Sequence, residues 1–190
     1  NIVSRNRYGA LVLNSENVVF VDIDEPRIGI WKRLFGSKNL PQKQQMLEMI
    51  KQQISLDAYD GLGFRVYETC AGMRLIITGR TFPAGSDESR KILRKFNADP
   101  LYAMLCTKQQ CYRARLTPKP YRMRLKAHRI NYLRTEPEQQ SVEQWLETYK
   151  RASDRFATYK FVNEFGRPGH NAVIKYHDNV TKARESLALA

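Results

Sequence analysis

The pattern of hydrophobic and polar residues along the chain predicts short strands alternating with helices. Residues 8–13 and 18–24 are rich in apolar residues, many of them β-branched, and the polar segment between them is typical of a turn, so we expect a hairpin. Apolar residues then recur at helical spacing from Pro41 to about residue 55. Residues 63–69 and 73–78 follow as strands, and the short turn between them predicts a second hairpin.

The second half of the chain continues this alternation. Ser86 is typical of a helix N-cap and begins a helical region that extends to about Cys106. Residues 111–117 alternate in character as a strand does. Apolar stripes predict two further helices, over residues 140–156 and 171–187.

Without its ends, the predicted order is strand, helix, strand, strand, helix, strand, which is the order of the split βαβ unit. We therefore predict an α+β fold whose core is an antiparallel ferredoxin-like or RRM-like sheet, of the kind found in polymerase palms. We expect one added N-terminal strand. Residues 1–135 would form this palm-like core, and residues 136–190 would form a C-terminal helical extension packed on it.

Two aspartates end the strand at residues 18–24 and are two positions apart. The period of a strand places both carboxylates on one face, which we expect to be the open face opposite the helices. In the split βαβ topology this strand neighbours the second strand of the 63–78 hairpin, so its end lies beside the tip of that hairpin. The residues predicted to gather there are Asp22, Asp24, Glu68, Thr69, Gly72 and Arg74.

These side chains suit a metal ion and a nucleotide. Carboxylate oxygens are preferred ligands of Mg²⁺ and Mn²⁺, so Asp22 and Asp24 are candidate metal ligands, and Glu68 is a candidate further ligand or base. Arg74 offers a planar fork that suits a triphosphate, with Thr69 and Gly72 beside it. The alternative is that the aspartates only end a strand and bind Arg74 or loop amides, and we weigh the two interpretations equally.

Composition favours a polyanionic partner. The 190 residues include 32 Lys and Arg against 19 Asp and Glu, a formal net charge of +13, which creates a positive field suited to nucleic acid. No apolar run approaches the roughly 18 residues of a membrane-spanning helix and no secretory signal opens the chain, so no membrane partner is expected. The 3 cysteines cannot all pair and lack the spacing of a zinc site, which favours a cytoplasmic protein.

The strongest nucleic-acid signal is a basic segment interleaved with tyrosines, because cations bind phosphate while aromatic faces stack on bases. Two prolines, Pro118 and Pro120, would hold this segment extended along the edge of the sheet. The basic strip consists of Arg113, Arg115, Lys119, Arg122, Arg124, Lys126 and Arg129, and Tyr112, Tyr121 and Tyr132 lie among them. The alternative is a solvated edge. We favour binding, because so many neighbouring cations repel one another unless an anion is present.

Two of these segments together resemble the archaeo-eukaryotic primase superfamily, which includes the polymerase domains attached to bacterial DNA ligases. They are Phe20-Val21-Asp22-Ile23-Asp24-Glu25-Pro26 and Glu68-Thr69-Cys70-Ala71-Gly72-Met73-Arg74-Leu75. The resemblance implies metal-dependent nucleotidyl transfer with Asp22 and Asp24 as metal ligands. The chain departs from the family at Arg74, where a histidine is expected, and at the basic strand 111–117, where a third acid is expected. Glu68 would then supply the last ligand, or the fold has lost catalysis.

Two other families share shorter segments with the chain. Residues 18–24 and Thr78-Gly79-Arg80 are similar to haloacid dehalogenase-like phosphatases, whose first aspartate is a nucleophile. We rank that alternative lower, because the phosphatase sheet is parallel whereas Thr78 ends a hairpin strand. Residues 61–67 are similar to the aromatic strand motif of RRM domains, although on the second strand of the unit.

The sequence therefore predicts a nucleic-acid-binding or nucleotide-binding protein with a primase-like or polymerase-like core. In one hypothesis Asp22 and Asp24 hold Mg²⁺ or Mn²⁺ for nucleotidyl transfer. In the others the core is catalytically inactive, and the protein is a binding module or a basic structural component of a ribonucleoprotein assembly. The C-terminal helices are candidate contacts for a protein partner.

Overall fold

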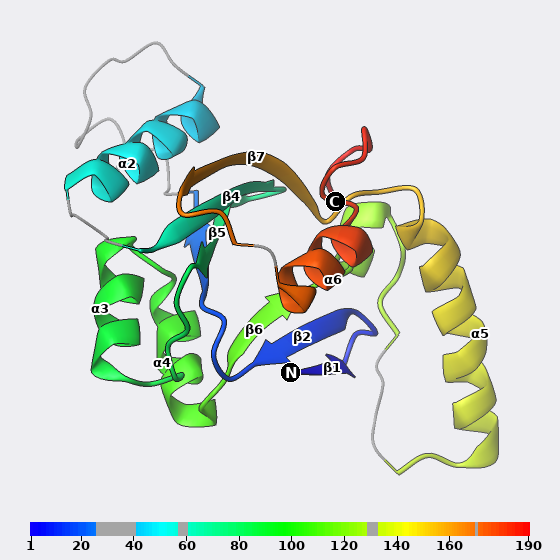
Figure 1. Ribbon diagram of the computed structural model, residues 1–190. Helices are drawn as coiled ribbons and strands as arrows, with labels where there is room; N and C mark the ends of the chain where they lie inside the picture. The colour runs from blue at the N-terminus through cyan, green and yellow to red at the C-terminus, as the bar shows by residue number, and fades with distance from the viewer. Residues whose placement is uncertain (26–40, 57–60, 129–132, 170) are drawn as a thin grey trace. The chain divides into compact units, whose positions relative to one another are not determined.

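The computed structural model describes residues 1–25, 41–56, 61–128, 133–169 and 171–190 (Figure 1). The sequence also predicts one or two helical turns over residues 26–35, and these residues lie outside the described part of the chain. The chain forms two compact units, each assembled from separate segments. Unit 1 consists of Asn1–Ser15, Arg113–Phe161 and His170–Ala190, and unit 2 consists of Glu16–Tyr112 and Val162–Gly169.

Strands and helices alternate as the sequence predicts, with two further strands that it did not predict, one near each end of the chain. The strands are β1 (Ile2–Arg5), β2 (Leu11–Ser15), β3 (Phe20–Asp24), β4 (Gly63–Thr69), β5 (Gly72–Thr78), β6 (Tyr112–Arg115) and β7 (Tyr159–Gly166). The helices are α2 (Gln42–Leu56), α3 (Asp87–Lys95), α4 (Pro100–Gln109), α5 (Glu136–Ser153) and α6 (Ala172–Thr181), and the 3₁₀ turn η1 covers Pro120–Met123.

The sheet of unit 2 contains the strands that carry the predicted aspartate site. Its strand order is β3-β5-β4-β7, and β5 pairs antiparallel with both β3 and β4. The predicted β4–β5 hairpin is therefore confirmed, as is the predicted position of β3 beside β5. The register places Asp22 directly opposite Arg74, and Asp24 opposite Gly72 at the hairpin tip.

The other edge of β3 is covered by Asp99 and by the first turn of α4, and none of the described strands pairs with it there. The backbone N–H of Asp99 donates to the carbonyl of Asp22 at 3.0 Å, and the Tyr102 hydroxyl donates to the carbonyl of Phe20 at 2.9 Å. These contacts occupy carbonyls that a neighbouring strand would need. The predicted strand at 111–117 exists as β6, but it lies beside β2 in the other sheet, so its predicted membership of the split βαβ sheet is wrong.

The predicted hairpin of residues 8–13 with residues 18–24 does not form either. β2 pairs antiparallel with β1 and lies between β1 and β6. The polar residues that follow β2 do not reverse the chain, because the carbonyls of Glu16 and Asn17 accept hydrogen bonds from Ala84 and Phe82, each at 3.0 Å. The N-terminal strands β1 and β2 therefore belong, with β6, to a different sheet from β3.

The C-terminal region contributes a strand as well as the two predicted helices. β7 joins the edge of the unit 2 sheet beside β4, a strand that the sequence interpretation did not include. Helices α5 and α6 confirm the helices predicted near residues 140–156 and 171–187. The predicted division at residue 136 differs from the two units, because α5 belongs to the same unit as β1 and β2.

A column of aromatic rings organises unit 1. The rings of Trp145 and Tyr149 stack at 5.2 Å between centroids, and His128 stacks on Trp145 at 6.0 Å. Gly9 has a φ of +86°, and a Cβ at this position would lie 2.3 Å from Cζ3 of Trp145, so the ring fits only against glycine. The column therefore ties the N-terminal segment to α5.

These observations confirm the predicted α+β fold class with C-terminal helices. Among the described residues, none of the helices combines the length and the apolar character that crossing a membrane requires.

Candidate functional site

The aspartate strand forms an ion pair with the strand beside it. Arg74 Nε donates to Asp22 Oδ1 at 2.7 Å, and Arg74 Nη2 donates to Asp22 Oδ2, so the guanidinium engages both carboxylate oxygens. The Arg74 side chain is 4% exposed and that of Asp22 is 32% exposed. This bidentate geometry is the strong form of an arginine–carboxylate contact, and it follows from the direct opposition of the two residues in the β3–β5 register.

Glu68 does not join the aspartates. Alternation along β4 places Glu68 on the opposite face of the sheet from Tyr67, which lies opposite Arg74. Glu68 instead accepts from Lys43 Nζ of α2 at 2.6 Å, and the same ammonium donates to the carbonyl of Thr69 at 2.8 Å. The predicted grouping of Glu68 with the aspartates is therefore wrong, because the period of the strand separates them.

The donor set at this edge does not fit a divalent cation. A metal at Asp22 would have to displace Arg74 from both oxygens, and Glu68 is on the other face. Among the described residues there is no group of three or more His, Cys, Asp or Glu side chains that could hold a metal ion. The Mg²⁺ or Mn²⁺ site stays a prediction, and the geometry favours the alternative in which Asp22 stabilises the sheet.

The other predicted nucleotide-binding residues have structural roles at the hairpin tip. A Cβ at Gly72 would lie 2.1 Å from the carbonyl oxygen of Ile23, so glycine is required for β5 to approach β3 this closely. The hydroxyl of Thr69 accepts a hydrogen bond from the N–H of Ala71 at 3.2 Å and closes the turn. Both residues are explained by the hairpin itself.

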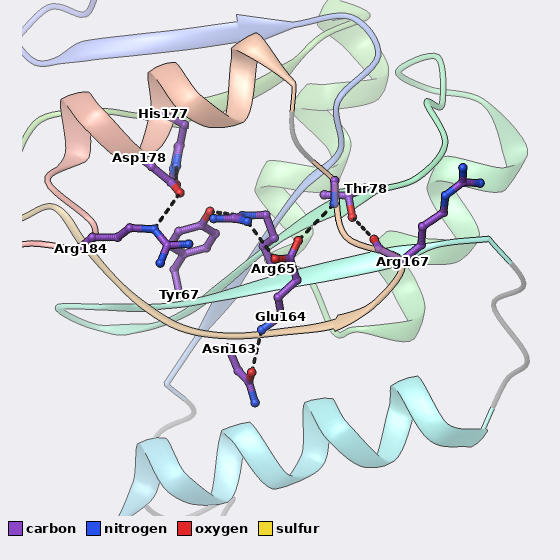
Figure 2. A network of polar contacts seen from close by, with 10 residues as sticks. Arg65, Tyr67, Thr78, Asn163, Glu164, Arg167, His177, Asp178 and Arg184 are labelled. Atoms are coloured by element: carbon purple, nitrogen blue, oxygen red, sulfur yellow. Dashed lines mark hydrogen bonds and ion pairs between the residues drawn. The ribbon is translucent and has the colours of Figure 1, made fainter.

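The face of the sheet that was expected to be open carries a buried polar network (Figure 2). Arg65 is 2% exposed; its Nε donates to the Tyr67 hydroxyl at 2.9 Å, and its Nη1 lies 3.1 Å from Glu164 Oε2. The other oxygen of Glu164 accepts from the N–H of Gly169 at 3.2 Å, and Thr78 donates to the carbonyl of Arg167 at 3.1 Å. The network joins β4 and β5 to β7 and the residues after it. The sequence interpretation missed Arg65, although a lone cation within the apolar run of β4 was a signal.

The basic strip divides into parts with different surroundings. Arg113 and Arg115 lie on β6 and are partly buried, and Arg115 Nε is a buried atom without a hydrogen-bond partner in the described structure. Lys119, Arg122, Arg124 and Lys126 lie on or beside η1. Arg129 and Tyr132 fall outside the described residues. The strip therefore leaves the sheet after β6 instead of following its edge.

The most distinctive part of the strip is an exposed tyrosine between two cations, which we call the η1 cluster: Lys119, Tyr121 and Arg122. Tyr121 is 66% exposed, although most large side chains of this unit are covered. The Lys119 ammonium and the centre of the Arg122 guanidinium each lie 5.9 Å from the centroid of the Tyr121 ring. Slight burial acts to raise the pKa of Tyr121, but the charges of Lys119 and Arg122 outweigh it and lower the pKa below its usual value.

The η1 cluster is held in place by a rigid turn. Pro120 and Met123 are buried, and Arg124 has a φ of 58°, which turns the chain after η1. The N–H groups of Arg122 and Leu125 donate to the carbonyls of Lys119 and Pro120 at 3.0 Å. These contacts fix the backbone and leave the Tyr121 ring outward.

The following segment is fastened to α5. Trp145 Nε1 donates to the carbonyl of Lys126 at 3.0 Å, and the His128 ring stacks on the Trp145 ring. The exposed cations of the strip are therefore carried on ordered backbone.

Cations outside the strip are often paired, whereas those around η1 are not. Lys43 binds Glu68, Arg74 binds Asp22 and Arg90 binds Asp87. Among the residues with described positions, no carboxylate lies within 4.0 Å of the charged nitrogens of Lys119, Arg122, Arg124 or Lys126. This part of the strip is therefore a positive surface without internal compensation.

Comparison of the chain with models of known protein families, with curated proteins and with solved structures found no match. The resemblance to the archaeo-eukaryotic primase superfamily therefore stays a prediction.

Proposed function

We propose that the protein binds nucleic acid through the η1 cluster and the cations beside it. The observation that carries this proposal is the exposed ring of Tyr121, held on a rigid turn between Lys119 and Arg122. An aromatic face flanked by uncompensated cations matches a base together with its phosphates.

The preferred form of nucleic acid is single-stranded. The bases of a duplex are stacked on one another, so an exposed ring can reach a base face only when the strand is open. Stacking of this kind tolerates every base, since each has a π-face, and the cations read only phosphate. We therefore expect weak sequence preference and strong salt dependence.

The alternative functions have less support. Nucleotidyl transfer needs a metal, and Arg74 engages both oxygens of Asp22. The phosphatase alternative needs a parallel sheet, whereas β5 is antiparallel to both of its neighbours. A structural role in a ribonucleoprotein assembly and a cytoplasmic location are compatible with the same basic surface and stay predictions.

The test is binding of a short single-stranded oligonucleotide with an internal fluorescent label, followed by anisotropy over a range of salt concentrations. We expect Tyr121→Ala to weaken binding by about 5- to 150-fold, since loss of one stacked base costs about 1–3 kcal/mol. Lys119→Ala and Arg122→Ala should each reduce the salt slope by about 0.7.

Tyr176→Ala is the matched control, because Tyr176 is another exposed tyrosine of unit 1, 41% exposed, and follows Lys175 on α6. It should bind as the parent does. Equal loss in the Tyr121 and Tyr176 variants, or no loss in either, would move the binding surface away from η1. Absence of binding by the parent to any oligonucleotide would reject the proposed function itself.

A further inference from the structure

Unit 1 contains a cavity that none of the functions considered above uses. Its volume is about 560 Å³, within the range of small-molecule sites, and all of its lining residues belong to unit 1. Its lining includes the apolar side chains of Leu11, Leu146, Phe156 and Val180. The cavity is therefore large enough for a nucleotide and offers a surface on which a base or sugar can pack.

Tyr149 also lines this cavity, and its hydroxyl bonds to two neighbouring lining residues. The Tyr149 hydroxyl is 2.8 Å from Thr117 Oγ1 and donates to the carbonyl of Pro118 at 2.7 Å. Burial raises the pKa of Tyr149 to about 12, while the hydrogen bond with Thr117 and the charges of Arg115 and Arg5 act in the opposite direction. The guanidinium groups of Arg115 and Arg5 therefore create a positive potential at the Tyr149 hydroxyl.

Further cations line the opening. Arg5, Lys150 and Lys182 all line the cavity, together with Glu147 and Asp154. Lys182 is held by the carbonyl of Asp154 at 2.6 Å, and Arg5 donates to the carbonyl of Gly9 at 2.5 Å. Lys150 is exposed and lies one residue after Tyr149 on α5. The cavity thus combines apolar side chains with cations and two carboxylates. Because Lys182 pairs with Asp154 Oδ1 at 3.4 Å, Arg5 and Lys150 are the cations that suit a compact molecule with an anionic group.

The cavity adjoins the η1 cluster along the chain. Pro118 lines the cavity, and Lys119 is the next residue. Tyr121 is three positions after Pro118, so their Cα atoms are separated by no more than about 11 Å. A ligand in the cavity and a base on Tyr121 can therefore belong to neighbouring nucleotides of one strand.

We propose that this cavity binds the phosphorylated terminal nucleotide of the single strand whose following bases meet the η1 cluster. The proposal rests on the proposed function and adds recognition of a strand end. The apolar lining residues pack against the terminal base and sugar, and Lys150 and Arg5 bind the terminal phosphate. A terminal phosphate carries more negative charge than a phosphodiester. An internal nucleotide lacks this group and gains less from the same cations.

The test compares one short oligothymidylate in three forms: phosphorylated at the 5′ end, phosphorylated at the 3′ end, and without terminal phosphate. Each form carries its label at an internal position. We expect one phosphorylated form to bind about tenfold tighter than the unphosphorylated form, with a salt slope steeper by about 0.7. Equal affinity of all three forms would overturn the cavity proposal and leave the proposed function standing. Failure of all three to bind would overturn both.

Two variants then locate the effect. Lys150→Ala removes a cation, and Asn179→Trp fills the cavity from an exposed lining residue without a change of charge. Both should abolish the gain from the terminal phosphate while the unphosphorylated form still binds. Lys175→Ala, which removes an exposed lysine of α6 that does not line the cavity, should retain the gain. Retention of the gain in both cavity variants, with melting temperatures near that of the parent, would place the end-recognition site elsewhere and overturn the proposal.

Discussion

Replacing Asp22 by alanine separates the two interpretations of the aspartate strand. If Asp22 stabilises the sheet, its loss leaves the guanidinium of Arg74 in the interior without the carboxylate that engages it through two nitrogens. If Asp22 and Asp24 instead form a metal pair, the two residues are equivalent, and replacing either should remove metal binding with similar effect. The ion-pair hypothesis therefore predicts unequal effects of replacing Asp22 and Asp24, whereas the metal hypothesis predicts similar effects.

The size of the expected loss follows from the burial of the two partners. Removal of one member of a buried ion pair costs about 3–5 kcal/mol, because the remaining charge is left uncompensated. Arg74 is 4% exposed and cannot reach solvent, whereas Asp22 is 32% exposed, so water can enter the space that its side chain leaves. We therefore expect Asp22→Ala to lower the free energy of unfolding by about 2–3 kcal/mol. For a chain of this length that is a fall of about 4–12 °C in Tm.

Urea denaturation followed by circular dichroism measures this change as a lower midpoint at constant m value. Asp24→Ala is the control, because Asp24 is exposed on the same strand, and its replacement should lower the free energy of unfolding by clearly less than Asp22→Ala does. Equal effects of the two variants on stability, or a loss of less than about 0.5 kcal/mol for Asp22→Ala, would refute the ion-pair reasoning. The double variant Asp22→Leu/Arg74→Met should recover much of the loss, because it removes both charges.

Two further predictions concern stability. Gly72→Ala should lower the free energy of unfolding by about 1–3 kcal/mol, because the new Cβ would lie 2.1 Å from the carbonyl oxygen of Ile23. Urea denaturation would measure this change. An unchanged free energy of unfolding would mean that β5 can move away from β3. Burial raises the pKa of Tyr112 and of Tyr149 to about 12 in the folded protein, above the ordinary value of 10.0. Folding therefore favours the protonated hydroxyls, and the free energy of unfolding should be unaffected below pH 10 and fall as the pH rises from 10 to 12. In Tyr149→Phe the free energy of unfolding should fall less steeply over this pH range. If tyrosinate absorbance showed that all tyrosines ionise together near their ordinary pKa, the prediction would be contradicted.

The pattern of apolar and polar residues within each segment was sufficient to predict most helices and strands. The predictions that failed depend on contacts between segments that are far apart in the sequence. The β4–β5 hairpin and the helices follow from periodicity and turn residues, and each is present. The position of β6 could not be predicted from residues 111–117 themselves. It depends on Asp99 and Tyr102, which bind the edge of β3 and exclude another strand there. β7 was missed because its middle is polar and its pairing with β4 is far from local in sequence.

The sequence was sufficient to predict which residues of the candidate site meet, but not whether they form a metal site or an ion pair. The sequence correctly predicts that Asp22 meets Arg74, since antiparallel neighbours bring them together. The same pattern of two acids and an arginine suits a metal site and an ion pair, and only the distances between side-chain atoms favour one of them. For the basic strip, the tyrosine and the cations were evident. The rigid turn that exposes Tyr121 depends on the burial of Pro120 and Met123, which could not be inferred from the positions of the charged residues in the sequence.

The two units use positive charge in different ways, and this difference supports the assignment of function to unit 1. In unit 2, Arg65 and Arg74 are buried and bind Glu164 and Asp22, so their charges are compensated inside the fold and serve stability. Around η1 the cations lie on ordered backbone, and no carboxylate of the described residues lies within 4.0 Å of them, so their mutual repulsion opposes folding and an external anion or salt would relieve it. A fold that compensates charge in one place and leaves it uncompensated in another, beside an exposed aromatic ring, has the charge distribution of a protein that binds phosphate from outside. Under the proposed function, the aspartate strand, which first suggested an enzyme, belongs to the scaffold, and the basic turn is the part that binds the ligand.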